Sequence, residues 1–226
     1  MMSSRREIDQ APRALPPIIH VVDDDAAFRL ATGNLLRACG YRVVPYDCAM
    51  ALLANPPGDE PGCILLDVRM VGCNGPQLQD KLIGLGSRLP VVFVTGYVDI
   101  ATAVQAIKAG AEDVLTKPVP KQRLLDAIAR ALAHGAEVRD RDRRITGLRA
   151  LVARLTAREH EVFALLARGK PHKQIAYALG TSERTIKFHR HNILQKCEAR
   201  SLADLAVIAD RLGMLALPVA AEAGSE

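Results

Sequence analysis

The sequence predicts an α/β domain with a five-stranded parallel sheet, followed by a helical linker and a small all-helical domain. Over residues 18–133 short apolar runs alternate with helical patterns, which is typical of a parallel sheet with right-handed crossovers. From residue 134 onward only helical patterns occur. The second part is also basic: residues 135–226 carry 16 Lys+Arg against 11 Asp+Glu, whereas residues 1–134 carry equal numbers. This asymmetry favours a nucleic-acid partner for the second part.

Five short apolar runs predict the strands, and turn-forming residues such as Gly40, Pro56 and Gly110 separate them from the helices. The expected strands are 18–22, 42–46, 63–66, 91–94 and 113–116. The expected helices are 28–39, 48–53, 75–85 and 100–109, and a last one that begins near residue 121.

Chemically capable side chains follow four of these strands. Asp23 and Asp24 follow the first strand, Asp67 the third, Thr95 the fourth and Lys117 the fifth. Because the carboxyl ends of parallel strands meet at one edge, we expect these groups to lie together. Three carboxylates would repel one another unless a cation lies among them, and their hard oxygens suit Mg²⁺. Asp67 could then act as a nucleophile that forms an acyl phosphate, with Thr95 and Lys117 holding the phosphoryl oxygens.

Each of these residues also has an ordinary structural explanation. An aspartate after a strand often only caps the next helix, and a threonine at a turn or a lysine before proline says little alone. The agreement of all four strand ends favours the site. Dinucleotide binding is excluded, because the first strand leads to three aspartates and not to a glycine-rich turn.

Residues 18–133 resemble the receiver domain of two-component response regulators, which has a flavodoxin-like fold. The matching stretches are Val21-Val22-Asp23-Asp24-Asp25, Leu66-Asp67-Val68-Arg69-Met70, Val94-Thr95-Gly96 and Lys117-Pro118. The resemblance implies that Asp67 accepts phosphate from a partner histidine kinase. It also implies that Mg²⁺ binds Asp23, Asp24, Asp67 and the backbone carbonyl of Arg69.

Two residues depart from the receiver pattern. Val71 stands where receivers usually carry proline, which predicts a less rigid loop. Val114 stands where they usually carry a rotating Phe or Tyr that acts as a switch together with Thr95 and Lys117, and a β-branched side chain has little room to swing. We therefore expect intact site chemistry with altered coupling to the output domain.

A charged helical linker is expected over residues 134–153. Its apolar residues recur at seven-residue steps, from Val138 to Ile145 to Val152 and from Leu148 to Leu155. This short seam is consistent with a dimerising coiled coil or with a helix that packs on its own domain.

The second part contains two helices joined by a short turn, a pattern that predicts a helix-turn-helix. Thr156 and Glu159 form a capping box before the first helix of this part, and helices are expected over 171–179 and 183–196. On the helix at 183–196, an exposed arc of donors and one aromatic opposes an apolar arc of Ile186, Ile193 and Cys197. The exposed arc comprises Arg184, Lys187, Phe188, His191 and Gln195.

Such a helix can enter the major groove of DNA and contact base edges. Arg190 and Lys173 are expected to contact phosphate instead. A plain helical hairpin is the alternative structure.

Residues 150–213 resemble the LuxR-type DNA-binding domain, and the two parts together resemble the NarL/FixJ family of response regulators. The matching stretches are Arg154-Leu155-Thr156-Ala157-Arg158-Glu159, Ala167-Arg168-Gly169, Lys173-Gln174-Ile175-Ala176 and Thr185-Ile186-Lys187-Phe188-His189-Arg190. The resemblance implies that Lys187, Phe188 and His191 face the bases and that a closing helix over 201–212 dimerises. His191 stands where a lysine is common, so that base contact is expected to be weaker or pH-dependent.

The resulting hypothesis is a DNA-binding transcription regulator that a sensor histidine kinase phosphorylates on Asp67, with phosphorylation favouring a homodimer on paired promoter half-sites. RNA polymerase is a further candidate partner. The expected segments are a disordered tail (1–17), the receiver domain (18–133), the linker (134–153), the DNA-binding domain (154–213) and a second tail (214–226).

Two alternatives stay open. The receiver could act without phosphorylation, or the protein could be an aspartyl-phosphate phosphatase. Arg69 disfavours the phosphatase, because such enzymes carry a second carboxylate at that position. The first seventeen residues lack a secretory pattern, no apolar run reaches 18 residues and the five cysteines form no C-x-x-C pair. A cytoplasmic, non-enzymatic protein is therefore expected, without a disulfide framework or a zinc site.

Overall fold

A computed structural model describes residues 15–96, 104 and 106–215. The chain separates into two compact units, and the division falls between Arg139 and Asp140. Within the described ranges no helix is both long and apolar enough to cross a membrane.

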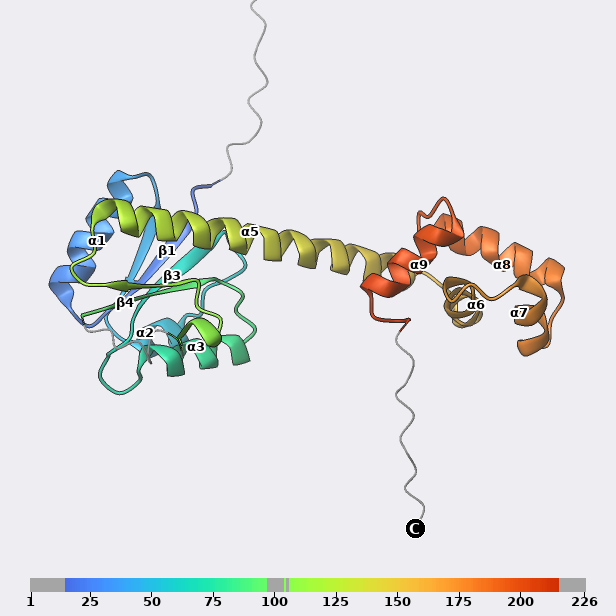
Figure 1. The fold of residues 1–226 in the computed structure, drawn as a ribbon, viewed down its shortest axis with the longest axis horizontal. Helices are drawn as coiled ribbons and strands as arrows, with labels where there is room; N and C mark the ends of the chain where they lie inside the picture. The colour runs from blue at the N-terminus through green and yellow to red at the C-terminus, as the bar shows by residue number, and fades with distance from the viewer. Residues whose placement is uncertain (1–14, 97–103, 105, 216–226) are drawn as a thin grey trace, which may run out of the picture. The chain divides into compact units, whose positions relative to one another are not determined.

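The first unit is built on a five-stranded sheet in which all neighbouring strands are parallel, in the order β2-β1-β3-β4-β5 (Figure 1). This confirms the predicted fold class. Non-consecutive neighbours require crossovers, which the helices provide. The strands are β1 (Ile18–Val22), β2 (Arg42–Tyr46), β3 (Gly62–Asp67), β4 (Val91–Thr95) and β5 (Asp113–Thr116).

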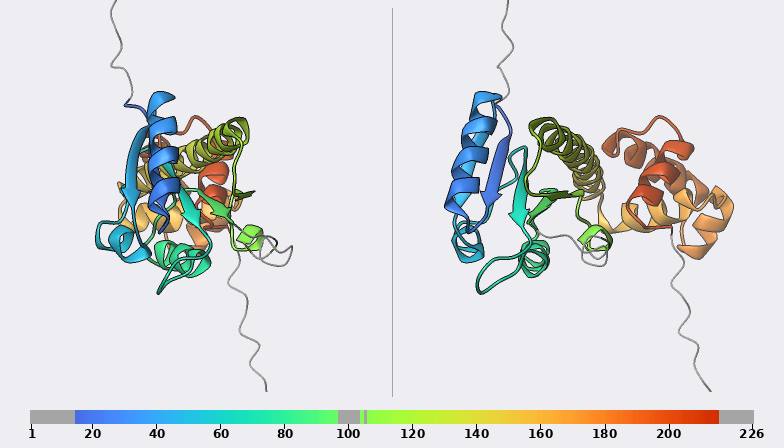
Figure 2. Two further views of the ribbon diagram at one scale, coloured as in Figure 1. Left: turned by 90° about the vertical axis from the view of Figure 1, so that its left-hand side faces the viewer. Right: turned by 60° about the vertical axis from the view of Figure 1, so that its left-hand side comes forward.

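Helices cover both faces of this sheet. They are α1 (Ala26–Ala38), α2 (Ala49–Ala54), α3 (Gly75–Gly84) and α5 (Lys121–Val152). Helices α2 and α3 lie on the face away from α5 (Figures 1 and 2). The expected helix at 100–109 lies partly outside the described residues, and Val104 and residues 106–108 are helical.

The two cores follow from the alternation of side chains along β3. Ile64 and Leu66 belong to one apolar cluster and Leu65 to another, because successive strand residues point to opposite faces. All six β3 residues are buried. A strand covered on both faces needs a nearly continuous apolar run, which is what the sequence supplies.

Helix α5 is continuous from Lys121 to Val152 and spans the division between the units. The expected helical linker over residues 134–153 is therefore the second part of this longer helix. Near its end, Leu148, Val152 and the following Leu155 pack into the core of the second unit. At these three positions the apolar seam therefore packs within its own chain, as the second interpretation of the seam proposed.

The described part of the second unit, up to residue 215, contains four further helices around one apolar cluster. Phe163, Ile186 and Leu205 from three of these helices are completely buried in it. Met214 and Leu215 also pack against this cluster, although they belong to the segment expected as a tail. The helices are α6 (Ala157–Ala167), α7 (His172–Ala178), α8 (Glu183–Lys196) and α9 (Leu202–Arg211).

A partly buried ion pair joins the start of α6 to the end of α8. The Glu159 carboxylate accepts hydrogen bonds from Lys196 Nζ at 2.6 Å and from the backbone N–H of Thr156 at 2.8 Å. Its residue is only 3% exposed. Burial alone would raise the pKa of Glu159, but the hydrogen bonds from Lys196 and Thr156 hold it below its ordinary value of 4.5.

We predict that Glu159→Gln lowers the free energy of unfolding of the second unit by about 1.5–3 kcal/mol at pH 7, because a charged hydrogen bond is lost. The depressed pKa means that the ionised carboxylate stabilises the unit above pH 4.5 and that this contribution is lost as the pH falls below it. Calorimetry at pH 7 and at acidic pH should show the difference between the proteins shrinking in acid.

The matched control is Glu161→Gln, which removes an exposed carboxylate from the same helix. It should leave the transition almost unchanged at both pH values. A Glu159→Gln protein as stable as the wild type at pH 7 would contradict the role of the pair.

Candidate functional sites

Three aspartates meet at the carboxyl edge of the parallel sheet. Asp23 and Asp24 directly follow β1, and Asp67 is the last residue of β3. One carboxylate oxygen from each lies within 4.8 Å of the others. Asp23 and Asp67 are buried, whereas Asp24 is exposed. The parallel pairing of β1 with β3 therefore brings together side chains that are more than 40 positions apart in the sequence.

Lys117 lies against this cluster. Its ammonium Nζ is 2.6 Å from Asp23 Oδ2 and 3.8 Å from Asp67 Oδ2. The same Nζ lies 4.2 Å from the centroid of the Phe28 ring, which adds a cation–π contact. Thr95 is buried at the end of β4, and its carbonyl accepts a hydrogen bond from the backbone N–H of Lys117 at 2.8 Å. The four strand ends thus converge as the sequence predicted.

The cluster is poorly neutralised. Burial raises the pKa of Asp67, the nearby Lys117 lowers it, and the negative charge of Asp23 raises it again. The net direction is upward, so the ionised form of Asp67 is disfavoured in its surroundings. Three carboxylates with one ion-paired lysine keep an excess of negative charge, and the set consists entirely of hard oxygen donors. This donor set fits a divalent cation such as Mg²⁺.

The three consecutive aspartates after β1 have different structural roles. The Asp25 carboxylate accepts hydrogen bonds from the N–H groups of Ala27 and Phe28, so Asp25 is the N-cap of α1. Asp23 Oδ1 accepts from the Asp25 N–H at 3.0 Å, and its other oxygen pairs with Lys117. Asp25 is therefore a helix cap, as the structural explanation proposed. Asp23 and Asp24 instead belong to the carboxylate cluster with Asp67.

The loop after β3 is held close to Asp67 by a glycine. Gly75 begins α3, and its N–H donates to the Val68 carbonyl at 3.0 Å. A Cβ atom at this position would lie 2.6 Å from the Asp67 carbonyl oxygen and 2.7 Å from the Phe93 ring. Only glycine permits so close an approach. The side chain of Arg69 in this loop is exposed, and Val71 is 88% exposed.

Two contacts at the cluster were not foreseen from the sequence. Arg29 donates from its guanidinium to the backbone carbonyl of Asp23 at 2.5 Å, and Phe28 lies beneath Lys117. Both come from α1 and are apparent only once that helix is placed. Val114, in the position of the expected switch, is half-buried and packs against the core on the α2 and α3 side of the sheet.

The second site is the outer face of α8. Ile186, Ile193 and Cys197 are buried, as the helical pattern predicted. The five residues of the opposite arc are exposed: Arg184, Lys187, Phe188, His191 and Gln195. Phe188 is 62% exposed. This arc therefore presents three cationic or imidazole groups, one amide and one aromatic ring to solvent, side chains that can contact the edges and phosphates of DNA.

The turn between α7 and α8 has the local structure that a helix-turn-helix needs. Gly180 adopts a φ of 59°, and the Ser182 side chain accepts from the Thr185 N–H to cap α8. A guanidinium N–H of Arg158 donates to the Leu179 carbonyl and ties this turn to α6. Lys173 on α7 is exposed and Arg190 is half-buried. The 92%-exposed Tyr177 on α7 was not foreseen from the sequence.

Two family models match the chain. The response regulator receiver domain matches residues 19–129, and the LuxR family of bacterial regulatory proteins matches residues 153–209. Together they account for both compact units.

Individual proteins match over nearly the whole chain. Nodulation protein W of Bradyrhizobium diazoefficiens is 39% identical over 88% of this chain and 88% of its own length. Transcriptional regulatory protein FixJ of the same organism is 38% identical over 87% of this chain and 96% of its own.

Solved structures agree with these matches. The structure of response regulator StyR shares 43% identity and a TM-score of 0.76, covering 87% of this chain and 99% of its own. Full-length FixJ from B. japonicum shares 37% identity and a TM-score of 0.54, covering 88% and 98%. Members of this group are regulatory proteins and not classical enzymes. With a receiver domain, a LuxR-type DNA-binding domain and relatives of the same two-part organisation, the chain belongs to the NarL/FixJ family of two-component response regulators.

Proposed function

We propose that this transcription regulator is controlled by phosphorylation of Asp67 by a sensor histidine kinase. The observation that carries the proposal is the position of Asp67, whose carboxylate lies within reach of Asp23, Asp24 and Lys117 at the edge of the sheet. The rise in the pKa of Asp67 that burial causes supports it as well, because perturbed carboxyl groups gather at functional sites.

The side chains have separate roles in this reaction. A carboxylate oxygen of Asp67 attacks the phosphorus of a phosphohistidine, the new O–P bond forms, and the P–N bond breaks with its electron pair going to the departing imidazole. Asp23, Asp24, Asp67 and the backbone carbonyl of Arg69 would hold Mg²⁺, which supplies positive charge against the phosphoryl oxygens. Lys117 and the Thr95 hydroxyl bind the transferred phosphoryl group.

The proposed output is DNA binding by a homodimer on paired half-sites. The exposed α8 arc contacts bases through Lys187, Phe188 and His191, with Arg184 and Gln195 beside them. Lys173 and Arg190 contact backbone phosphates. Helix α9 contributes to the dimer, and RNA polymerase is a candidate partner at the promoter.

A second candidate function is regulation without phosphorylation. Two observations favour it. Val114 is a half-buried β-branched residue packed against the core, so it lacks the rotational freedom of an aromatic switch. Val71 is almost fully exposed in the loop after Asp67. In this version the receiver domain acts through protein contacts or a constitutive dimer.

Phosphorylation in vitro separates these two candidate functions. With Mg²⁺ and acetyl phosphate, the wild-type protein should gain the mass of one phosphoryl group, shift toward a dimer in size-exclusion chromatography with light scattering, and bind promoter DNA more tightly. Asp67→Asn should show none of these changes. An adduct without any change in size or affinity would support the phosphorylation-independent candidate.

A further prediction concerns the stability of the receiver domain. Because burial and the neighbouring aspartates disfavour a charge at Asp67, Asp67→Asn should raise the thermal midpoint of the receiver domain when Mg²⁺ is absent. The raised pKa gives the sign: the advantage of the variant should shrink as the pH falls and Asp67 of the wild type becomes protonated. Added Mg²⁺ should stabilise the wild type more than the variant. Equal midpoints under all conditions would contradict the proposed cation site.

Another prediction concerns the exposed face of α8. Lys187→Ala should cost about 1–3 kcal/mol in binding to the preferred promoter and should relax specificity at one base position. The matched comparison is Lys173→Ala, which should weaken binding evenly across sequences and reduce its salt dependence. Fluorescence anisotropy with a promoter and a scrambled duplex at several salt concentrations measures both effects. Identical behaviour of the two variants would contradict their separate roles.

A further inference from the structure

The ammonium group of Lys117 has an aromatic neighbour as well as carboxylate partners. Its Nζ lies 4.2 Å from the centroid of the Phe28 ring, 2.6 Å from Asp23 Oδ2 and 3.8 Å from Asp67 Oδ2. The Lys117 side chain is only 18% exposed, so the protein replaces most of its hydration. The quadrupole of an aromatic ring attracts a cation over its face, and this attraction is stronger in a desolvated site.

The position of Phe28 is fixed by the start of α1. Asp25 caps this helix, and its carboxylate accepts a hydrogen bond from the Phe28 N–H at 3.2 Å. The next residue, Arg29, donates to the Asp23 carbonyl. The Phe28 side chain is half-buried and packs against the apolar cluster that contains Leu115. The ring is therefore a fixed surface beside Lys117.

An aromatic ring differs from a carboxylate as a partner for this ammonium, because the ring has no formal charge. The cluster already brings three carboxylates together. A further carboxylate would increase their mutual repulsion. The ring attracts the ammonium without adding negative charge. An aliphatic side chain would exclude water from Lys117 as well, but it has no quadrupole to hold the cation.

This difference becomes important when Asp67 reacts. The phosphoryl group takes the place of the free carboxylate charge on Asp67, and Asp23 and Asp24 would be engaged by the divalent cation. Both changes weaken the attraction between these carboxylates and Lys117, whereas the attraction by the ring stays the same. The ammonium can therefore remain beside Asp67 and face the phosphoryl oxygens.

We propose that Phe28 is a positioning residue for the phosphorylation of Asp67. Its ring holds the Lys117 ammonium at the carboxyl edge of the sheet by a cation–π contact, so that Nζ is already in place to bind the transferred phosphoryl group. This role rests on the phosphorylation of Asp67 proposed above. The ring acts through Lys117 and not on the reacting atoms.

The test weakens the quadrupole of the ring and keeps its shape. Phe28 is replaced in the full-length protein by monofluoro-, difluoro- and trifluorophenylalanine, which withdraw increasing electron density from the ring face. Mass spectrometry follows the rate at which the protein gains one phosphoryl group from acetyl phosphate with Mg²⁺. We expect this rate to fall stepwise along the series, to roughly one half to one tenth of the wild-type rate. A purely structural role of Phe28 would give equal rates.

A second measurement needs neither Mg²⁺ nor a phosphodonor. An aromatic ring shifts the NMR signals of protons above its face upfield. The ε-methylene protons of Lys117 should therefore lie upfield in the wild type of their position in Phe28→Leu, which keeps an apolar side chain but removes the ring. Phosphorylation of Phe28→Leu should be at least as slow as that of the trifluorinated protein.

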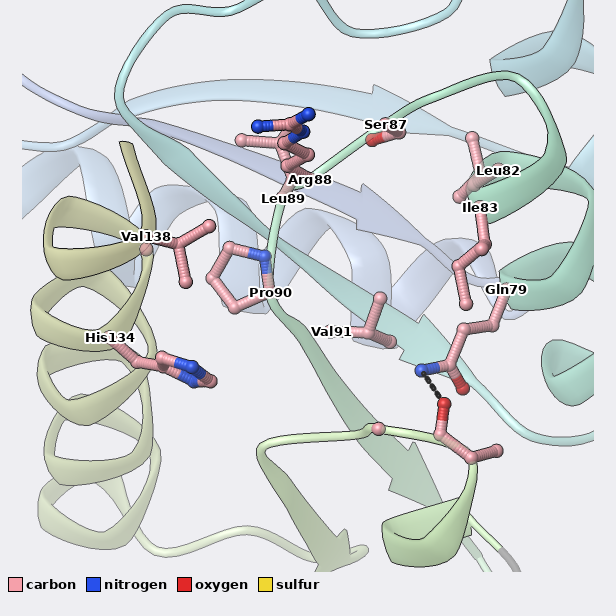
Figure 3. A pocket seen from close by; sticks show the side chains of 13 residues that line it. Gln79, Leu82, Ile83, Ser87, Arg88, Leu89, Pro90, Val91, His134 and Val138 are labelled. Carbon is pink, nitrogen blue, oxygen red and sulfur yellow. Dashed lines mark hydrogen bonds between the residues drawn. The ribbon is translucent and has the colours of Figure 1, made fainter. Parts of the chain in front are cut away.

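Two matched controls remove exposed apolar side chains elsewhere in the first unit. Leu30→Ala changes the same helix at a position that is 64% exposed. Ile83→Ala changes α3 at the cleft beside the start of β4 (Figure 3), at the opposite end of that strand from Thr95. Both variants should be phosphorylated at the wild-type rate and keep the wild-type signals of Lys117.

The outcomes distinguish this role from the proposed function. Equal rates along the fluorinated series, with normal phosphorylation of the wild type, would overturn the role of Phe28 and leave the proposed function intact. Identical Lys117 signals in the wild type and in Phe28→Leu would overturn the contact itself. A wild-type protein that gains no phosphoryl group would overturn both the proposed function and this role.

Discussion

The site in the first unit depends on the sheet edge at which four parallel strands end. Parallel pairing puts Asp23, Asp67, Thr95 and Lys117 at one edge, and the lysine ammonium contacts two of the three carboxylates. Without Lys117 the buried aspartates would face one another with little compensation, which is costly in a desolvated site. The lysine in turn depends on β5 lying beside β4, and on Phe28 of α1 supporting its Nζ. Helix placement, sheet order and site charge are therefore mutually dependent.

The sequence was sufficient to predict those elements whose pattern of apolar and polar residues follows their burial directly. The buried strands appear as short apolar runs, and α8 begins and ends at Glu183 and Lys196, the expected residues, because Ser182 provides a cap and both faces are distinct in composition. The convergence of Asp23, Asp67, Thr95 and Lys117 was predictable as well, since parallel sheets always bring their carboxyl ends together. No such general rule covers Arg29 and Phe28, whose contacts depend on how α1 is rotated against the sheet.

Helix α5 shows why a change of pattern is not the same as the end of an element. The composition becomes charged after Gly135, which suggested a helical linker over residues 134–153, and the backbone is helical to Val152 as part of the same helix that begins at Lys121. What changes along α5 is the surface it packs against: the sheet through Leu124 and Ile128, then the second core through Leu148 and Val152.

The three consecutive aspartates after β1 have three different structural roles. Asp25 serves as a helix cap, a role that Ser, Thr or Asn performs almost as well. Asp23 is buried and paired with an ammonium, and a neutral substitute there would leave Lys117 without its closest partner. Asp24 is exposed at the rim of the cluster. These three neighbouring aspartates should therefore be substituted at very different rates during evolution. Asp25 should tolerate the most change.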